Sequence, residues 1–497
     1  MYTNNKLKIA KNDNTELNIV SKMLNRHGII TGATGTGKTV TVKVLAETLS
    51  AAGIPCFVAD VKGDLSSLAF PGDKESLQER LDNLKIEDFK TEQFPVRFWD
   101  IYGKTGHPIK ARIDSFTPSL LTKILNLTEA QNGMLNIAYR IAKDESIPMI
   151  NFQDLKTILK HVNENKDKYS ANYGNITTQS IGTIERKLLE FENNNGDVFF
   201  GNPEIKLEDL IRTDLSGKGY INILDATELV KDNRLYGTYM LWLLNTLFDK
   251  MSEVGDLEKP RLVFFIDEAH MLFDEMNSEM KNKITQIVKL IRSKGIGLFF
   301  ISQNPSDIPE VISTQLGNRI QHNLKAYTPN ELKSVKVAAQ SFRVNPNFDT
   351  EKVISELKTG EALVSFMNES GEPSIVERAF ILPPQSRFGT ITDLERQNIV
   401  LNSDLYMYYS QKSTDKTAAE VLNQSSTTTD PTGYVNQTEL FLQQQKEKEL
   451  AKQQNSSTTK TTKKTTTKKS SLERKVENKI ENKIATKIVN SIFKMFK

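Results

Sequence analysis

Short apolar runs alternate with helical periodicities along much of the chain, and this alternation predicts an α/β fold. The run 28–31 leads into a glycine-rich loop, and apolar positions repeat every three or four residues through 39–50, which predicts a helix. Gly53 ends that helix, and the apolar run 54–60 predicts a second strand. The order strand, loop, helix, strand indicates the start of a mostly parallel, doubly wound sheet with helices on both faces.

The strand pattern stops and later resumes. From 112 to 215 helical patterns dominate and runs of Val, Ile and aromatic residues are scarce, so we predict an inserted helical subdomain. We therefore expect one sheet-containing core built from 1–111 and 216–390. In its second part, apolar runs predict strands over 220–224, 262–266, 297–301 and 319–324 and a hairpin made of 361–366 and 374–381.

The chain changes character after this predicted core. Residues 391–470 are rich in Ser, Thr, Gln and Lys, a composition that buries too little apolar surface to fold, so we predict a mostly disordered linker. Over 471–497 apolar residues recur at every fourth position with lysines between them, which predicts a basic amphipathic helix. Three roles stay open for this tail: a solvated extension, an anchor to a membrane surface or an anionic partner, and a helix that pairs with its own copies.

Charge also separates the tail from the rest of the chain. The net charge is +3 overall, but residues 451–497 carry 13 Lys or Arg and 3 Glu, a net of +10. The first 450 residues are therefore acidic, at about −7, and overall charge gives no argument for nucleic-acid binding. With no apolar run long enough for a membrane span, no apolar N-terminal signal and Cys56 as the only cysteine, the sequence predicts a cytoplasmic protein.

A phosphate-binding loop follows the first predicted strand. The pattern G-x-x-x-x-G-K-[ST] is complete and lies between a strand and a helix, the context in which it binds the phosphates of a nucleotide. Its backbone amides are expected to surround phosphate oxygens, Lys38 to contact the β- and γ-phosphates, and the Thr39 hydroxyl to bind Mg²⁺. The predicted contacts to ATP are Gly32, Ala33, Thr34, Gly35, Thr36, Gly37, Lys38, Thr39 and Val40.

An acidic strand end supplies the second half of a nucleotide site. The apolar run 262–266 ends in Asp267 and Glu268, a Walker B pattern. We expect Asp267 to hold Mg²⁺ and Glu268 to act as the general base that polarises the attacking water. The alternative is an ordinary solvated strand end, but a buried strand has no structural need to end in two carboxylates.

Polar side chains near other strands complete the candidate set. Gln303 follows a predicted strand and is expected to sense the γ-phosphate or the attacking water. Asp60 and Lys62 follow another strand, at the edge where open α/β sheets bind ligands. Arg292 ends the helix before the Gln303 strand, and its position alone favours a solvated arginine that complements the helix dipole; Arg319 has the same ambiguity.

Together these motifs resemble the HerA/FtsK superfamily of ring-forming P-loop ATPases, and within it the bacterial HerA-like proteins of the YjgR type. The similarity extends over about residues 1–390, in blocks such as HGIITGATGTGKTVT, FVADVKGDLS, LVFFIDEAH, LIRSKGIGLFFISQNPSDIP and QLGNRIQHNLKAYTP. It implies a RecA-like core, hexamers with ATP between subunits, and motor action on double-stranded DNA. It also implies that Arg292 is an arginine finger for a neighbouring subunit and Gln303 the sensor, with Arg319 as second choice.

One departure from the family bears on function. HerA proper begins with a β-barrel domain that docks a nuclease, and a phosphate loop at residue 32 leaves no space for that barrel, so a partnership with that nuclease is not expected. Two functions stay open: an ATP-driven DNA translocase or helicase, and an ATP-dependent assembly or regulatory ATPase that acts on a protein or membrane-associated complex without DNA. The resemblance favours the first, whereas the acidic body and the unusual tail favour the second.

Overall fold

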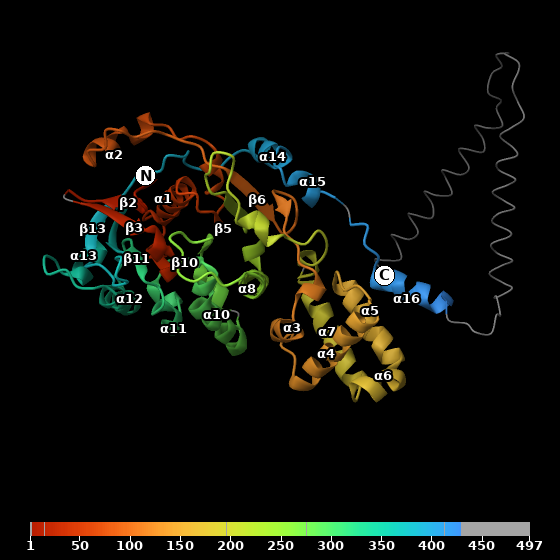
Figure 1. Ribbon diagram of the computed structural model, residues 1–497. Helices are drawn as coiled ribbons and strands as arrows, with labels where there is room; N and C mark the ends of the chain where they lie inside the picture. The colour runs from red at the N-terminus through yellow and green to blue at the C-terminus, as the bar shows by residue number, and fades with distance from the viewer. Residues whose placement is uncertain (1, 14, 195, 275, 412, 429–497) are drawn as a thin grey trace, which may run out of the picture. The chain divides into compact units, whose positions relative to one another are not determined.

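A mixed sheet of thirteen strands forms the centre of the computed structural model, which describes residues 2–13, 15–194, 196–274, 276–411 and 413–428 (Figure 1). Along the sheet the order is β1-β2-β13-β12-β11-β4-β10-β9-β5-β8-β6-β7, and β3 pairs with β2. Neighbours from β11 to β7 in this order are parallel, and those from β11 to β1 are antiparallel. This confirms the predicted α/β fold. The strands are β1 (Tyr2–Thr3), β2 (Lys6–Lys11), β3 (Glu16–Val20), β4 (Gly28–Thr31), β5 (Cys56–Asp60), β6 (Val96–Asp100), β7 (His107–Pro108), β8 (Ile221–Asp225), β9 (Leu262–Ile266), β10 (Ile296–Ser302), β11 (Asn318–Gln321), β12 (Glu361–Ser365) and β13 (Glu377–Ile381).

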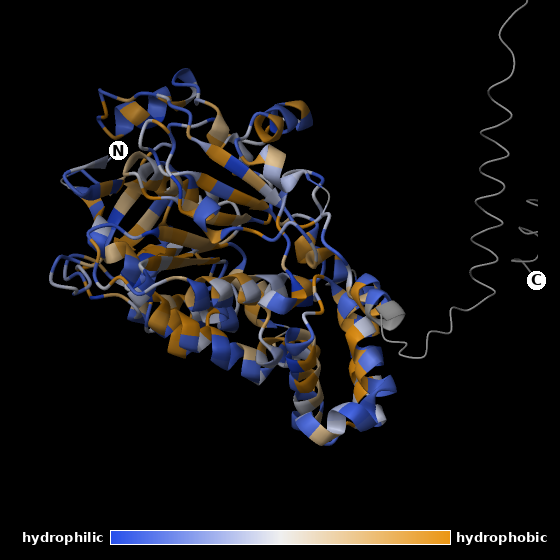
Figure 2. Ribbon diagram, turned by 45° about the vertical axis from the view of Figure 1, so that its right-hand side comes forward, coloured by the Kyte–Doolittle hydropathy of each residue, from blue (hydrophilic) through white to orange (hydrophobic). Residues whose placement is uncertain are grey.

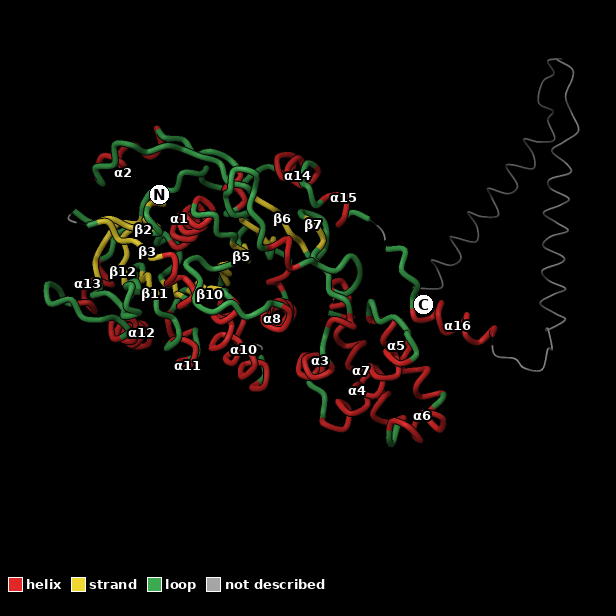
Figure 3. The backbone as a smooth tube through the Cα atoms, in the orientation of Figure 1, coloured by secondary structure: helices red, strands yellow, loops and turns green. Residues whose placement is uncertain are grey.

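The helices lie on both faces of this sheet, and those within residues 118–193 form a group beside it, called the helical group below (Figure 3). None of the helices in the described part of the chain is both long and apolar enough to cross a membrane. Their bounds are α1 (Lys38–Ala51), α2 (Gln78–Asn83), α3 (Pro118–Leu125), α4 (Glu129–Asp144), α5 (Phe152–Glu164), α6 (Lys166–Tyr173), α7 (Thr178–Asn193), α8 (Asn233–Lys250), α9 (Ala269–Asp274), α10 (Ser278–Leu290), α11 (Glu310–Ser313), α12 (Pro329–Gln340), α13 (Thr350–Glu356), α14 (Asp393–Leu401), α15 (Tyr406–Tyr409) and α16 (Ala418–Thr428).

Strand β9 illustrates how both faces of the sheet are covered. Leu262, Phe264 and Ile266 belong to the buried cluster that contains α8 and α10, on one face. Val263 and Phe265 belong to the cluster that contains α1, on the other. Because successive side chains of a strand point to opposite faces, a strand buried on both sides is a continuous apolar run, as the orange strands of Figure 2 show.

The strands next to the phosphate loop lie where the hydrophobic pattern predicts them, but β1, β2, β3, β6 and β7 are additional. In β2, lysines alternate with Leu7 and Ile9, which are buried, so the strand is apolar on one side only. In β6, Arg97 is buried although it carries a charge. Its guanidinium donates to the Asp209 carbonyl at 2.7 Å and to the Asp404 carboxylate at 2.8 Å, partners that lie far away in the sequence.

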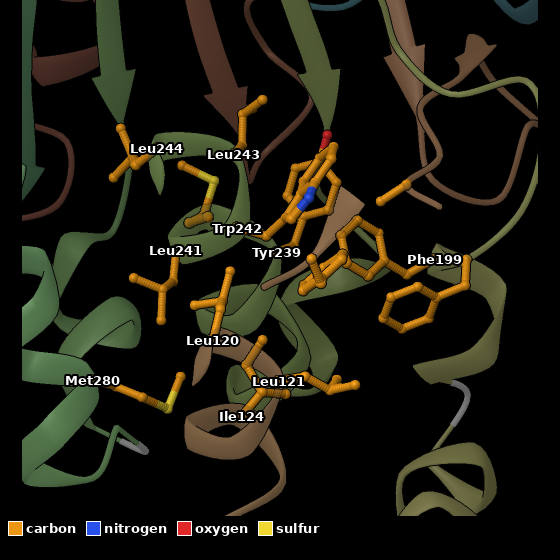
Figure 4. Close-up of a cluster of buried hydrophobic side chains, with 14 of the residues drawn as sticks. Leu120, Leu121, Ile124, Phe199, Tyr239, Leu241, Trp242, Leu243, Leu244 and Met280 are labelled. Carbon is orange, nitrogen blue, oxygen red and sulfur yellow. The ribbon is translucent and has the colours of Figure 1, made fainter. Parts of the chain in front are cut away.

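The five helices α3 to α7 form most of the predicted insertion, and the sequence sets several of their starts. The Thr117 hydroxyl accepts from the backbone of α3, and Thr128 and Asn151 form capping boxes at α4 and α5. Their apolar faces share one buried cluster with α8 and with one face of the sheet. Figure 4 shows Leu120, Leu121 and Ile124 of α3 in the same buried cluster as Leu241 and Trp242 of α8. The core of these helices is therefore continuous with the core on one face of the sheet.

The region after the β12–β13 hairpin differs from the predicted linker over 391–470. Its first part contains α14, α15 and α16. The Tyr409 hydroxyl donates to the buried Asp209 carboxylate at 2.8 Å, and the Ala418 amide donates to Asp154 at 2.8 Å. These contacts order a segment whose composition alone does not indicate a fold. The remainder of that linker and the helix predicted over 471–497 lie outside the described residues.

Candidate active site

The phosphate loop joins β4 to α1 and takes backbone conformations that need glycine. Gly32, Gly35 and Gly37 have φ angles of 153°, 80° and 117°, which L side chains rarely adopt. A Cβ on Gly32 would lie 2.5 Å from the Cβ of His322, whereas one on Gly35 would meet no heavy atom within 4 Å. The loop is therefore packed tightly at its base and open at its tip, as a cradle for phosphate oxygens requires.

Lys38 stands at the first position of α1, directly after the loop. Its side chain is buried, and its ammonium donates hydrogen bonds to the carbonyl oxygens of Gly32 and Ala33, the second at 3.2 Å. Thr39 and Val40 follow in the first helical turn and are half-buried. All three side chains thus belong to the helix end at which backbone N–H groups favour an anion.

A buried histidine that belongs to none of the sequence motifs holds the loop against the sheet. His322 follows β11; its Nε2 lies 2.8 Å from the Thr41 hydroxyl and its Nδ1 lies 2.9 Å from the Glu361 carbonyl. Burial lowers the pKa of His322 to about 4, so the ring is neutral at pH 7 and Nδ1 carries the proton that this carbonyl accepts. The Gly360 amide also donates to the Thr36 carbonyl at 2.9 Å. The His322–Thr41 contact joins positions 281 residues apart in the chain, and the His322–Glu361 contact positions 39 apart, which explains why local patterns missed them.

Two acidic residues end β9 beside the loop. The Asp267 carboxylate accepts the Glu268 amide at 2.9 Å, and Glu268 has a φ of 44°, which is rare for a residue with a side chain. Burial, followed by the Glu268 charge, raises the pKa of Asp267 to about 7. A half-buried carboxylate whose pKa is raised in this way fits a divalent cation, which would offset the cost of its ionisation. Thr39 and Asp267 are the side chains that would hold Mg²⁺ together with phosphate oxygens.

Gln303 lies between the phosphate loop and the acidic strand end. Its Oε1 accepts from the Thr34 hydroxyl at 3.4 Å, and its Nε2 donates to Glu268 Oε2 at 3.4 Å. On the other side, the Lys62 ammonium pairs with Glu268 Oε1 at 3.0 Å. Burial acts to raise the pKa of Glu268, but Lys62, His270 and Gln303 outweigh it, so the pKa is lowered. The structure thus brings Thr34, Gln303, Lys62 and Glu268 into one cluster.

Asp60 shapes the loop that carries Lys62. One oxygen of its carboxylate accepts the amides of Lys62 at 3.3 Å and Gly63 at 2.8 Å, and the other accepts the Leu65 amide at 3.0 Å. Burial, followed by the charge of Asp64, raises the pKa of Asp60 to about 6. Since both carboxylate oxygens are used by the backbone, Asp60 positions the loop and leaves Lys62 as the side chain that contacts the site.

The two candidate arginines lie away from this cluster. Arg292 is in the short helix Ile291–Lys294 before β10, at the opposite edge of the sheet from the phosphate loop, because β10 and β4 are parallel. Its guanidinium pairs with the exposed Asp256 at 2.7 Å. Arg319 is near the start of β11 and donates to the Ser313 carbonyl at 2.8 Å. Within one chain, neither arginine contacts the phosphate loop or Glu268.

An open cleft of about 460 Å³ borders the cluster, and its walls come from the loop, from α9 and from the segment between β11 and α12. The amide of Asn304 donates to the Ser334 hydroxyl at 2.8 Å across one side of it. The cleft gives solvent and ligand access to the phosphate loop at Ala33. Its lining residues are Ala33, His270, Asp274, Gln303, Asn304, Asp307, Leu324, Lys325, Glu331 and Ser334.

Loop, acidic strand end and parallel sheet together are those of a P-loop ATPase. The family described as helicase HerA-like C-terminal matches residues 5–496, and the chain belongs to that family. It is 26% identical over 377 residues to the DNA double-strand break repair helicase HerA of Sulfurisphaera tokodaii, covering 73% of this chain and 67% of that protein. It is 25% identical over 361 residues to the protein of the same name from Sulfolobus acidocaldarius, covering 71% of this chain and 64% of the relative. The chain thus spans about two thirds of these relatives.

A solved structure shares the fold. The bacterial conjugative coupling protein TrwBdeltaN70, in a trigonal form with sulphate, aligns with a TM-score of 0.50 and 12% identity, over 78% of this chain and 94% of that one. At this identity the likeness concerns the fold alone. The family match confirms the resemblance to HerA-like P-loop ATPases that the motifs indicate.

Proposed function

We propose that this protein is an ATP-hydrolysing ring motor that acts on double-stranded DNA and binds ATP between subunits. The observation that carries the proposal is the separation of the candidate catalytic groups. Lys38, Glu268 and Gln303 lie at the carboxyl edge of the parallel strands, and Arg292 lies at the amino edge. A second copy, placed with its amino edge against this carboxyl edge, would supply the missing arginine.

The residues of one chain divide the work of hydrolysis. The loop amides and Lys38 bind and orient the phosphates, Thr39 and Asp267 hold Mg²⁺, and Glu268 accepts a proton from the attacking water. Mg²⁺, when bound, would neutralise negative charge on the phosphate oxygens. Gln303 already joins Thr34 to Glu268, which supports a sensor role in reporting the occupancy of the loop to the base.

The DNA substrate comes from the relatives. Two of them are described as DNA double-strand break repair helicases, and a third, from Sulfolobus acidocaldarius, as a DNA import protein, CedB, to which the chain is 25% identical over 356 residues. We propose that the activity common to these relatives is movement along duplex DNA. We extend this activity, and a hexameric ring, to this protein.

A second candidate is an assembly or regulatory ATPase that acts on a protein or membrane-associated complex. The acidic first 450 residues, with a net charge of about −7, favour it, because proteins that bind the phosphate backbone concentrate positive charge. The basic residues of 451–497 would then serve as a contact to an anionic partner or membrane surface.

ATP turnover with and without duplex DNA, measured over a range of salt concentrations, separates the two candidates. The motor should show DNA-stimulated turnover and DNA binding that weakens steeply as salt increases, since phosphate contacts release counterions. Lys38→Ala is the control that removes turnover in both conditions. Turnover that ignores DNA, together with the lack of salt-dependent DNA binding, would overturn the motor in favour of the second candidate.

A further inference from the structure

The carboxylate of Glu268 has partners on both oxygens. Oε1 lies 3.0 Å from the Lys62 ammonium; Oε2 lies 3.4 Å from the Gln303 amide nitrogen and 3.4 Å from His270 Nδ1. The Glu268 side chain is only 5% exposed. A general base needs a free lone pair directed at the water whose proton it takes. Each oxygen of the Glu268 carboxylate thus has a polar neighbour, and the Lys62 ammonium is the nearest of the three.

The side chain of Lys62 can move away from Glu268 while the backbone of its loop keeps its position. The backbone of its loop is fixed by the Asp60 carboxylate, which accepts the amides of Lys62, Gly63 and Leu65. The Lys62 side chain is 40% exposed and has several rotatable bonds. The ammonium can therefore move from Glu268 to another anion at the same strand edge without a change in the fold.

We propose that Lys62 restrains Glu268 in the resting site and releases it when a phosphate group competes for the Lys62 ammonium. The inference rests on the proposed function, because it takes Glu268 as the base for ATP hydrolysis. Lys62 is here a positioning residue, since it acts through Glu268. The competing phosphate has two sources, the nucleotide in the loop and the backbone of bound DNA, and the experiment separates them.

A purely structural role for Lys62 is the alternative. In that case the ammonium would only offset the charge of a buried carboxylate, and its loss would lower stability or turnover. If Lys62 instead restrains Glu268, removal of the Lys62 ammonium leaves the Glu268 carboxylate available as the base, and turnover rises. The two roles thus give opposite signs for the change in kcat, and the sign decides between them.

The first experiment is steady-state turnover of full-length Lys62→Met, which removes the charge but keeps most of the side-chain volume. Without DNA, kcat should rise several-fold while KM for ATP stays near the wild-type value, and Lys62→Arg should restore much of the restraint. The added activity should vanish in the Lys62→Met, Glu268→Gln double variant. Lys104→Met is the matched control: it breaks the exposed Lys104–Glu228 pair, also 3.0 Å, in the loop after β6, and should leave kcat unchanged.

The ratio of turnover with DNA to turnover without it identifies the source of the phosphate. If DNA releases Lys62, this ratio should fall towards one in Lys62→Met. If the nucleotide releases Lys62 for only part of each cycle, kcat should rise by the same factor with and without DNA, and the ratio is unchanged. A kcat that falls or stays the same in Lys62→Met, with the melting temperature retained, overturns the restraint. If DNA does not change the turnover of the wild-type protein, the proposed DNA motor is contradicted. The comparison of wild type and Lys62→Met without DNA still tests the role of Lys62.

A structural readout is independent of turnover. Cryo-electron microscopy of the wild-type protein with a non-hydrolysable ATP analogue, with and without duplex DNA, gives the separation of Lys62 Nζ from Glu268 Oε1. We expect this separation to exceed about 4 Å, the limit of an ion pair, in at least one of the two complexes, with the ammonium on a phosphate oxygen. Retention of the 3.0 Å pair in both complexes contradicts the proposal.

Discussion

The two edges of the parallel strands hold charged residues in different ways. At the carboxyl edge, Lys38, Lys62, Asp267 and Glu268 are close enough that their charges shift one another's pKa. At the amino edge, Arg292 pairs with one exposed carboxylate, that of Asp256. The first edge is a prearranged cluster, and the second is an arginine held weakly at the surface.

Under the proposed function, these two edges are the two halves of one site, and they cannot meet within one subunit. Strand β10 has seven residues, Ile296–Ser302, and its length of roughly 23 Å separates Arg292 from Gln303. An arginine side chain is far too short to cover that distance. The exposed pair with Asp256 is also easy to break, which suits an arginine that changes partners on assembly.

The largest effect is expected at the carboxyl edge, from Lys38→Ala. The lysine is buried at the start of α1 directly after the loop, so its removal should bring turnover to background, a loss of more than about a thousandfold. Binding of a fluorescent ATP analogue and phosphate release measure the effect, and circular dichroism checks the fold. Turnover that survives this substitution would show that the loop is not the ATP site.

Arg292→Ala tests the amino edge and should reduce kcat by about a thousandfold while ATP binding changes little. Asp256→Ala is its matched control, because it removes the partner and keeps the arginine; turnover should stay within about twofold. Mixed rings of Arg292→Ala and Glu268→Gln subunits should regain part of the activity, because some interfaces then contain both intact groups. Mixtures without any regain would assign Arg292 to its own subunit or to a structural role.

Gly32→Ala tests how tightly the base of the phosphate loop is packed. Its φ of 153° and the 2.5 Å approach to His322 predict a loss of about 2–3 kcal/mol in the free energy of unfolding. Gly35→Ala has the backbone strain without the collision, so its loss should be about 1 kcal/mol. Chemical denaturation of the nucleotide-free protein compares them, and equal losses would contradict the proposed packing at the base.

A pH dependence of the stability is expected at the amino edge, where His27 is buried. Its Nε2 lies 2.9 Å from the Val288 carbonyl, and its Nδ1 accepts the Leu298 amide at 3.0 Å. Burial first, and then the nearby Arg292 and Arg26, lower its pKa from 6.5 to about 4.

The unfolded chain therefore binds a proton at His27 before the folded chain does. This histidine's contribution to stability is complete above pH 6.5 and is lost as the pH falls from 6.5 towards 4, by up to about 3 kcal/mol. The difference in unfolding free energy between wild type and His27→Gln should narrow over that range. A constant difference would mean that His27 does not titrate with folding.

The parts of the molecule that the sequence predicts are those with a local signal. The apolar runs of β4, β5, β9 and β10 and the motifs at their ends are contiguous in the chain, so the hydrophobic pattern is enough to place them. The strand order then brings Gln303 to Glu268, as expected for polar residues at the carboxyl ends of neighbouring parallel strands. The roles of these side chains in hydrolysis remain predictions.

The parts that the sequence does not predict depend on distant partners. Arg97 puts a charge into the buried strand β6, which the hydrophobic pattern does not predict. Its contacts with Asp404 and the Asp209 carbonyl explain how this charge is buried. His322 has no local pattern that separates it from a solvated histidine, because Thr41 and the Glu361 carbonyl come from other elements. Composition likewise predicts disorder at Tyr409, whose order depends on the buried Asp209 carboxylate. Patterns within a window cannot show such pairings.

Helix α8 connects the nucleotide site to the helices of the buried cluster. The Tyr236 hydroxyl, near its start, donates to the Asp267 carbonyl at 2.9 Å, and Tyr239 and Trp242 pack a turn further on against Phe199, which follows the helical group in the chain (Figure 4). With 18 residues, α8 is a stiff rod of roughly 27 Å. Helix α8 thus contacts the strand end at Asp267 near its start and shares a buried cluster with α3 and α10, so a single helix joins the nucleotide site to these helices.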